Sequence, residues 1–207
     1  MMKTLTFKMK MMLLALIGFA AFATSCSKDD DNGPAPESEL EVVQVKDLDG
    51  TKKQVVKDKD GNDVEVAASV YYDFSAGKEV DSTSTTWDIK FNSTNLELGN
   101  GATAQLVSGV FSELVTAPSD GYSTEAIKTW YNYTNMTEPQ HAILPKPGTI
   151  IVLKTHDGKY VKVEIISYYK GNPDTTTAAF ADLSTRPAAR FYTFNYVVQP
   201  DGSTNLK

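Results

Sequence analysis

The stretch Thr149–Tyr169, TIIVLKTHDGKYVKVEIISYY, decides the fold. Two runs rich in β-branched and aromatic residues, Thr149–Thr155 and Lys159–Tyr169, flank the short polar segment His156-Asp157-Gly158. An Asp-Gly pair between two such runs is a strong hairpin signal, because these residue types tolerate the positive φ angles of a tight turn. The stretch therefore predicts two antiparallel strands.

Further strand-like runs lie on both sides of this hairpin. Trp87–Phe91 alternates apolar and polar residues strictly, as a half-buried strand does. Arg190–Val198 also alternates, and we expect it to pair with the hairpin and complete a sheet. Shorter β-rich runs are Glu41–Val45, Gln54–Val56, Val64–Val66, Val70–Phe74, Leu96–Leu98 and Ala104–Phe111. The polar segment Asp58–Asp63 predicts a hairpin turn between the second and the third of these.

Helix signals are scarce. Ser123–Tyr131 is the candidate: Ser123 or Thr124 can cap it, and Glu125 suits the positive end of a helix dipole. Runs of strands without alternating helices predict an all-β fold with mostly antiparallel sheets and one short helix. Two long irregular segments, 132–148 and 171–189, are the kind of loop that often carries function, and we expect both to reach the same end of the sheet.

The N-terminus has the features of an export signal. A basic segment precedes the apolar run Met11–Phe22, whose length fits the roughly 7–15 residues of a secretory h-region better than the roughly 20 of a membrane span. Small residues then lead to Cys26, the only cysteine, in a pattern that resembles a bacterial lipobox. Residues 1–25 are therefore predicted to be a lipoprotein signal peptide and Cys26 the lipidated residue; the alternative is an ordinary signal peptide with a coincidental cysteine.

The segment after Cys26 is polar, acidic and proline-containing, so residues 26–39 are expected to form a flexible lipidated tether. A lysine and acidic cluster directly after the lipidated cysteine resembles the surface-export tag of Bacteroidetes lipoproteins, although a generic solvated tether is the alternative. We therefore expect an outer-membrane lipoprotein that is exposed on the cell surface. Residues 40–207 remain for a single all-β domain.

Composition excludes several function classes. Removing the predicted signal takes away three lysines and no acid, so the net charge falls from −6 to −9, which argues against nucleic acid as a partner. No cysteine remains inside the fold and only two histidines do, which argues against a disulfide scaffold and a histidine-based metal centre. No nucleophile motif or paired catalytic carboxylates stand out, so the protein is predicted not to be an enzyme.

Four stretches, in this order, resemble the HmuY-like haem-binding lipoproteins of Bacteroidetes. They are Trp87–Phe91, Gln140–Lys146, Lys154–Tyr169 and Tyr192–Tyr196. The resemblance covers residues 40–207. It implies an all-β fold with one short helix, a non-covalently bound haem held between finger-like loops, and delivery of that haem to a TonB-dependent receptor for iron acquisition.

The resemblance also implies iron ligands, since this family grips haem iron from both sides with two histidines or two methionines. Met136 is the leading candidate, because it is the only methionine after the signal and lies in an irregular loop. Thioether and imidazole are both good axial ligands. His141 is an alternative to Met136 more than a partner, since five residues separate them in one segment. A gap-filling role for Met136 and a loop-anchoring role for His141 are the other interpretations.

The second ligand stays open. No methionine or histidine lies in 171–189, where one is expected if Met136 is the first ligand. The options are His156 at the hairpin turn, Tyr168 or Tyr169, ligation from one side only, or no haem. A solvated turn position is the other interpretation of His156. Iron in haem is the only metal that we expect.

Several aromatic residues suit a haem slot, which needs apolar walls and a few polar groups for the propionates. Candidate pocket residues are Tyr131, Tyr133, Tyr168, Tyr169 and Arg190. Each of them can instead serve strand packing or surface charge. The alternative functions are a related lipoprotein that has lost haem ligation and binds a glycan or a protein, and a structural or adhesive surface subunit.

Overall fold

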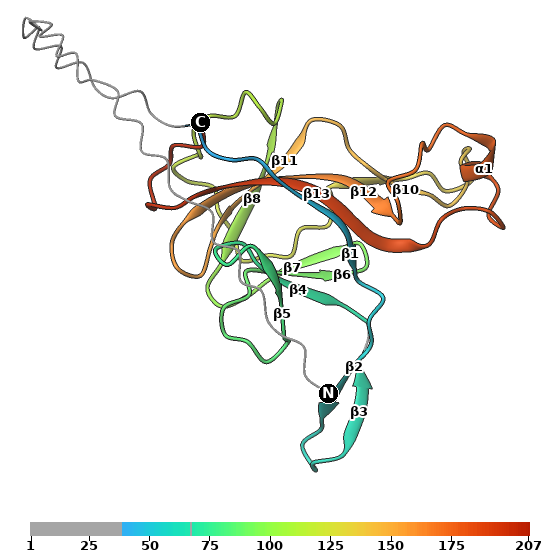
Figure 1. Ribbon diagram of the computed structural model, residues 1–207, viewed down its shortest axis with the longest axis horizontal. Helices are drawn as coiled ribbons and strands as arrows, with labels where there is room; N and C mark the ends of the chain where they lie inside the picture. Colours follow the sequence, from blue (N-terminus) through green and yellow to red (C-terminus); the bar gives the residue numbers. More distant parts are fainter. Residues whose placement is uncertain (1–38, 67) are drawn as a thin grey trace, which may run out of the picture. The chain divides into compact units, whose positions relative to one another are not determined.

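The computed structural model describes residues 39–66 and 68–207 (Figure 1). The predicted signal peptide, Cys26 and the tether as far as Ser38 lie outside the described residues. Within the described residues the chain forms antiparallel strands and a single short helix, and no barrel closes. The predicted fold class is confirmed. No helix in this part of the chain is both long enough and apolar enough to span a membrane.

The larger sheet has five strands in the order β1-β13-β12-β11-β8. Their bounds are β1 Val43–Asp49, β13 Ala189–Gln199, β12 Tyr160–Tyr169, β11 Thr149–Lys154 and β8 Thr103–Ser108. The predicted hairpin is confirmed: β11 and β12 are antiparallel neighbours, with Ile151 opposite Val163. The predicted pairing of the last strand is confirmed too, since β13 lies along β12 with Tyr196 opposite Val163.

A four-stranded sheet, ordered β5-β4-β6-β7, packs on the inner face of the larger sheet. Its strands are β5 Lys78–Val80, β4 Val70–Asp73, β6 Ile89–Asn92 and β7 Asn95–Leu98. Phe91 of β6 stacks on Phe194 of β13 with ring centroids 5.4 Å apart. Alternation explains this core, because every second residue of β13 points inward. Each such buried aromatic or aliphatic side chain contributes about 1.5–3 kcal/mol of transfer free energy.

Part of the outer face of the larger sheet is also buried. Ile150, Val152 and Val197 pack there against Phe111 and Leu206 in a second, smaller core. This second layer explains why β11 reads as a continuous apolar run, since both of its faces are covered.

Two further hairpins complete the strands. β2 Gln54–Lys57 pairs with β3 Asp63–Val66 around the predicted turn. β9 Tyr131–Tyr133 pairs with β10 Ile143–Pro145, within the segment that the sequence predicts to be an irregular loop. The regular pairing there is a correction to that expectation: the segment is a two-stranded ribbon with a long tip.

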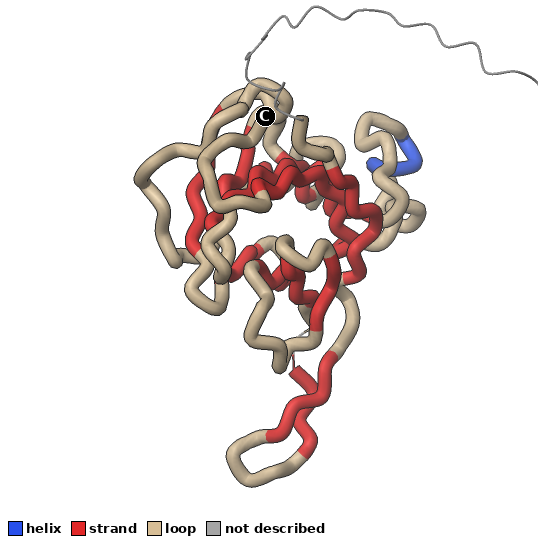
Figure 2. The backbone as a smooth tube through the Cα atoms, turned by 60° about the vertical axis from the view of Figure 1, so that its left-hand side comes forward, coloured by secondary structure: helices blue, strands red, loops and turns tan. Residues whose placement is uncertain are grey.

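The position predicted for the helix is wrong. Residues 123–131 contain no helix; Ser123 pairs with Ala104 and Ile127 pairs with Leu96 through backbone hydrogen bonds. The edges of β8 and β7 thus supply the partners that a helix would have found internally. The helix α1, Ala178–Ala181, lies instead in the segment between β12 and β13 (Figure 2). Thr177 caps its first turn by accepting the N–H of Phe180.

Candidate functional site

Two projections leave the same end of the larger sheet, as expected. We call residues 131–145 the first finger and residues 171–189 the second finger. Figure 1 shows β10 and α1 at the end of the sheet where β12 finishes. Tyr169, the last residue of β12, joins the two: its hydroxyl accepts the N–H of Ile143 at 3.0 Å, and its ring packs against Phe180 at 4.8 Å.

The tip of the first finger is held by its own backbone and by one threonine. The N–H of His141 donates to the carbonyl of Asn135 at 2.8 Å. The hydroxyl of Thr134 donates to the carbonyl of Pro139 at 2.6 Å and accepts the N–H of Ala142 at 2.8 Å. Ala142 is completely buried. The tip therefore has a fixed backbone although its side chains face solvent.

Three side chains that can ligate iron share this tip. Met136 is 66% exposed and Tyr133 is 53% exposed. His141 is exposed as well, and its Nδ1 lies 2.6 Å from the hydroxyl oxygen of Tyr133. The first finger thus offers a thioether, a phenol and an imidazole, of which the phenol and the imidazole are hydrogen-bonded to each other.

The second finger offers apolar surface and no comparable donor. Phe180 is buried, and the guanidinium of Arg186 lies 4.8 Å over its ring while donating from Nε to the Phe180 carbonyl at 2.8 Å. Leu183, just after α1, is 60% exposed. The sequence interpretation missed Leu183; the available signal was an isolated large apolar residue in a polar segment.

A cleft of about 320 Å³ lies between the fingers. β10 forms one wall, residues 172–175 form the other, and Tyr168 and Tyr169 line it from β12. The volume is at the small end of the range of ligand pockets. Both tyrosine hydroxyls have protein partners, since Tyr168 is hydrogen-bonded to Ser93 at 3.1 Å and Tyr169 to Ile143. Burial raises the pKa of Tyr168. These two predicted residues therefore line the cleft as neutral aromatic side chains.

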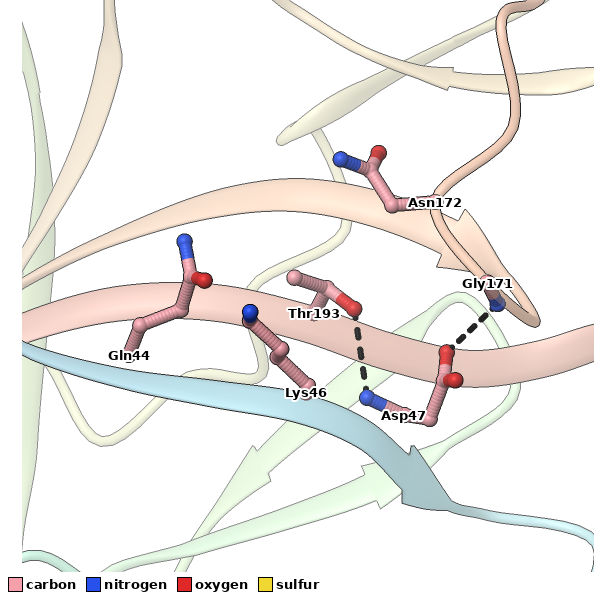
Figure 3. A pocket seen from close by; sticks show the side chains of 6 residues that line it. All are labelled: Gln44, Lys46, Asp47, Gly171, Asn172 and Thr193. Atoms are coloured by element: carbon pink, nitrogen blue, oxygen red, sulfur yellow. Dashed lines mark hydrogen bonds between the residues drawn. The ribbon is translucent and has the colours of Figure 1, made fainter.

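The base of the second finger is fixed by Asp47, as Figure 3 shows. Its carboxylate accepts the N–H of Gly171 at 2.8 Å, and its own N–H donates to the hydroxyl of Thr193 at 3.2 Å. Asp47 has a φ of 53° at an irregularity in the pairing of β1, which turns the residue toward the finger. A shallow polar pocket of about 260 Å³ surrounds this anchor, and Asn172 lines both it and the cleft.

His156 lies elsewhere. Its Nδ1 and its backbone N–H both contact Oδ1 of Asp88, at 2.8 and 2.9 Å, and the other carboxylate oxygen accepts the N–H of Phe74 at 2.9 Å. Burial raises the pKa of the fully buried Asp88, and these hydrogen bonds oppose the rise. Asp73 is close enough for the three side chains to form a potential cation site, but the hydrogen bonds around Asp88 explain the cluster as a structural junction.

The structure therefore does not bring His156 together with Met136 and His141. His156 precedes the first residue of β12, whereas the fingers lie at its last residue. The ten residues of β12 separate the two places by about 30 Å.

The remaining two predicted pocket residues, Tyr131 and Arg190, lie in different parts of the fold. Tyr131 is half-buried at the base of the first finger, with its ring 5.1 Å from that of Trp130. Arg190 reaches Ala68, whose carbonyl accepts a hydrogen bond from the guanidinium. It is absent from the lining of the cleft. The structure thus gathers six of the predicted residues at the finger end, namely Tyr131, Tyr133, Met136, His141, Tyr168 and Tyr169.

The comparison with solved structures finds similar chains. An apo HmuY analogue from Tannerella forsythia matches with a TM-score of 0.45 at 14% identity, covering 78% of this chain and 96% of that one. A Bacteroides vulgatus protein described as HmuY-like and haem-binding matches with a TM-score of 0.40 at 12% identity, covering 79% and 93%. A Bacteroides fragilis protein assigned as a lipoprotein matches with a TM-score of 0.46 at 13% identity, covering 75% and 87%.

No family model matches the chain, and no curated protein matches it.

Proposed function

We propose that the protein captures haem as cargo between its two fingers. The observation that carries the proposal is the tip of the first finger, where Tyr133, Met136 and His141 present three iron-binding groups. The cleft between the fingers combines aromatic and aliphatic side chains with polar ones, namely Ser167, Asn172, Asp174 and Thr175, and the second finger adds the exposed Leu183. A haem needs this combination, because the porphyrin is apolar and its iron requires a donor.

Ligation from one side follows from the distribution of donors. All three donors belong to the first finger, and the second finger contains no methionine, histidine or cysteine. Met136 and His156 are not proposed as joint ligands of one iron, because the length of β12 lies between them. We expect a five-coordinate haem iron with the second finger covering the opposite face of the porphyrin. The open sixth position would then bind an added ligand such as imidazole.

Binding without turnover suits a surface lipoprotein. The fingers are fixed at their bases by Tyr169 and Asp47, whereas their tips are exposed. Cargo held by exposed tips can be handed to a receptor without unfolding of the sheet. We propose that Cys26 anchors the chain by lipid to the outer membrane, on the cell-surface side, and that a TonB-dependent receptor accepts the haem.

A haemin titration tests this function. The mature chain, with Cys26→Ser to prevent lipidation, is titrated with haemin while the Soret band is followed. We expect saturation at one haem per chain. The triple variant Tyr133→Phe, Met136→Leu, His141→Gln should lose saturable binding. Tyr160→Phe, which repeats the tyrosine substitution at the other end of β12, should retain it.

Absence of saturable binding by the unsubstituted chain, in the oxidised and in the dithionite-reduced state, would overturn the haem proposal. The exposed apolar side chains of Met136 and Leu183 would then favour the second candidate, a protein-binding role for the same two tips. Retention of full affinity by the triple variant would contradict the placement of the site.

A further inference from the structure

The contact between Tyr133 and His141 narrows the choice among the three donors. Tyr133 lies opposite Ile143 in the ribbon, and His141 lies in the tip, two residues before Ile143 in the chain. The oxygen–nitrogen distance of 2.6 Å marks a short hydrogen bond between them.

The backbone holds the imidazole in this place. His141 has a φ of 55°, a conformation that is uncommon for a residue other than glycine and needs support from its surroundings. That support is the hydrogen bond from its N–H to Asn135 and the burial of the next residue, Ala142. The backbone that carries the imidazole is therefore held in place beside the phenol.

We infer that the oxygen of Tyr133 is the iron ligand of this site and that His141 is its positioning residue, so that the protein selects ferric haem. The inference rests on the proposed function. Tyrosinate is an established haem ligand. The ribbon partner of Tyr133, Ile143, forms part of the cleft wall.

Ligation requires the phenol to lose its proton. As the bond between iron and the phenol oxygen forms, the O–H bond breaks and the proton passes to Nδ1 of His141. The resulting imidazolium then donates a hydrogen bond back to the ligating oxygen. No electron is transferred in this step. The anionic oxygen is a hard ligand, which favours ferric over ferrous iron.

The other two donors lack this arrangement. Met136 is exposed, and a thioether is a soft ligand that favours ferrous iron. His141 can in principle ligate through Nε2, with Tyr133 as the partner that orients the ring. In that alternative His141 is the ligand and Tyr133 is the positioning residue. Spectroscopy distinguishes it from ligation by Tyr133.

The test compares Tyr133→Phe, His141→Gln and Met136→Leu with the unsubstituted mature chain and with Tyr160→Phe. Ferric haem should show a phenolate-to-iron charge-transfer band and a resonance Raman iron–phenolate vibration. Tyr133→Phe should lose both signals and at least about tenfold in ferric haem affinity. His141→Gln should keep the phenolate vibration, because the side-chain amide of glutamine can still donate a hydrogen bond to the ligating oxygen, but it should bind haem more weakly. Met136→Leu and Tyr160→Phe should keep both signals.

Two further measurements check that the loss of binding reflects a lost ligand and not a lost fold. Gallium(III) protoporphyrin, a hard and redox-inert analogue, should bind and should depend on Tyr133 in the same way. Thermal unfolding of each variant checks its fold; the phenol is half exposed, so Tyr133→Phe should unfold within a few degrees of the unsubstituted chain.

Retained affinity in Tyr133→Phe, together with loss of binding in His141→Gln, would overturn the inference in favour of His141 as ligand while leaving haem capture intact. Loss of binding in Met136→Leu alone would overturn it in favour of the thioether. Failure of the unsubstituted chain to bind haemin would instead defeat the proposed function itself.

Discussion

Oδ1 of Asp88 accepts two hydrogen bonds from His156, one from the backbone N–H at 2.9 Å and one from Nδ1 at 2.8 Å. Asp88 precedes β6 of the four-stranded sheet, and His156 lies in the turn between β11 and β12 of the larger sheet. The pair therefore fastens one sheet to the other at the end opposite the fingers. A histidine that the family resemblance offers as an iron ligand is thus part of the scaffold.

The first prediction distinguishes a scaffold role of His156 from a role as iron ligand. His156→Ala should lower the free energy of unfolding by about 1–3 kcal/mol, because Asp88 is left buried with fewer partners. Urea denaturation monitored by tryptophan fluorescence measures this loss. The haem spectrum of the variant should match that of the unsubstituted chain. A changed axial-ligand spectrum would return His156 to the list of ligands.

A second prediction concerns the stability of the fold at low pH. Burial alone would raise the pKa of Asp157, but hydrogen bonds from Lys159, Thr155 and Ser75 outweigh it and hold the pKa well below 3.8. The folded state therefore releases this proton more readily than the unfolded state does. The stability that Asp157 contributes is present above the unfolded pKa and is lost as pH falls through the folded pKa.

Asp157→Asn should consequently be less stable than the unsubstituted chain at pH 7, and the gap should narrow toward pH 2. Thermal unfolding at a series of pH values measures it. A gap of constant size would show that the charge of Asp157 is irrelevant and that only its hydrogen-bond geometry matters.

Tyr169 provides a third prediction, about the rigidity of the fingers. Its hydroxyl is the acceptor for the N–H of Ile143, so Tyr169→Phe leaves that amide without its partner. We expect a loss of about 1 kcal/mol and faster hydrogen exchange at Ile143. Haem should still bind, with faster dissociation. Exchange at Ile143 that is unchanged by the substitution would contradict a tie between β12 and the first finger.

The fourth prediction concerns Leu183. Because this side chain is 60% exposed, Leu183→Ser should change the free energy of unfolding by less than about 0.5 kcal/mol. It should nevertheless weaken haem binding, since the porphyrin face loses apolar contact. The matched control is Val55→Ser, an equally exposed aliphatic residue in the β2–β3 hairpin. Equal haem affinity in both variants would exclude the second finger from the site.

Much of the fold follows from local pattern. The hairpin around Asp157 and Gly158 and the alternation of β13 each depend on residues that are close in the chain, and both are found as predicted. The helix prediction fails for the opposite reason. Ser123 and Ile127 find backbone partners on Ala104 and Leu96, and sequence propensity contains no information about such distant partners.

The sequence by itself determined the main strands of the two larger sheets, the acidic character and the inventory of iron-binding side chains, and lipidation at Cys26 stays a prediction. Only the tertiary structure decided which of these side chains meet. Strand pairing places His156 about 30 Å from the fingers, the length of β12, and brings Tyr133 within 2.6 Å of His141. Periodicity is a local property that fixes which face of a strand is buried, whereas a binding site depends on contacts between segments far apart in the chain.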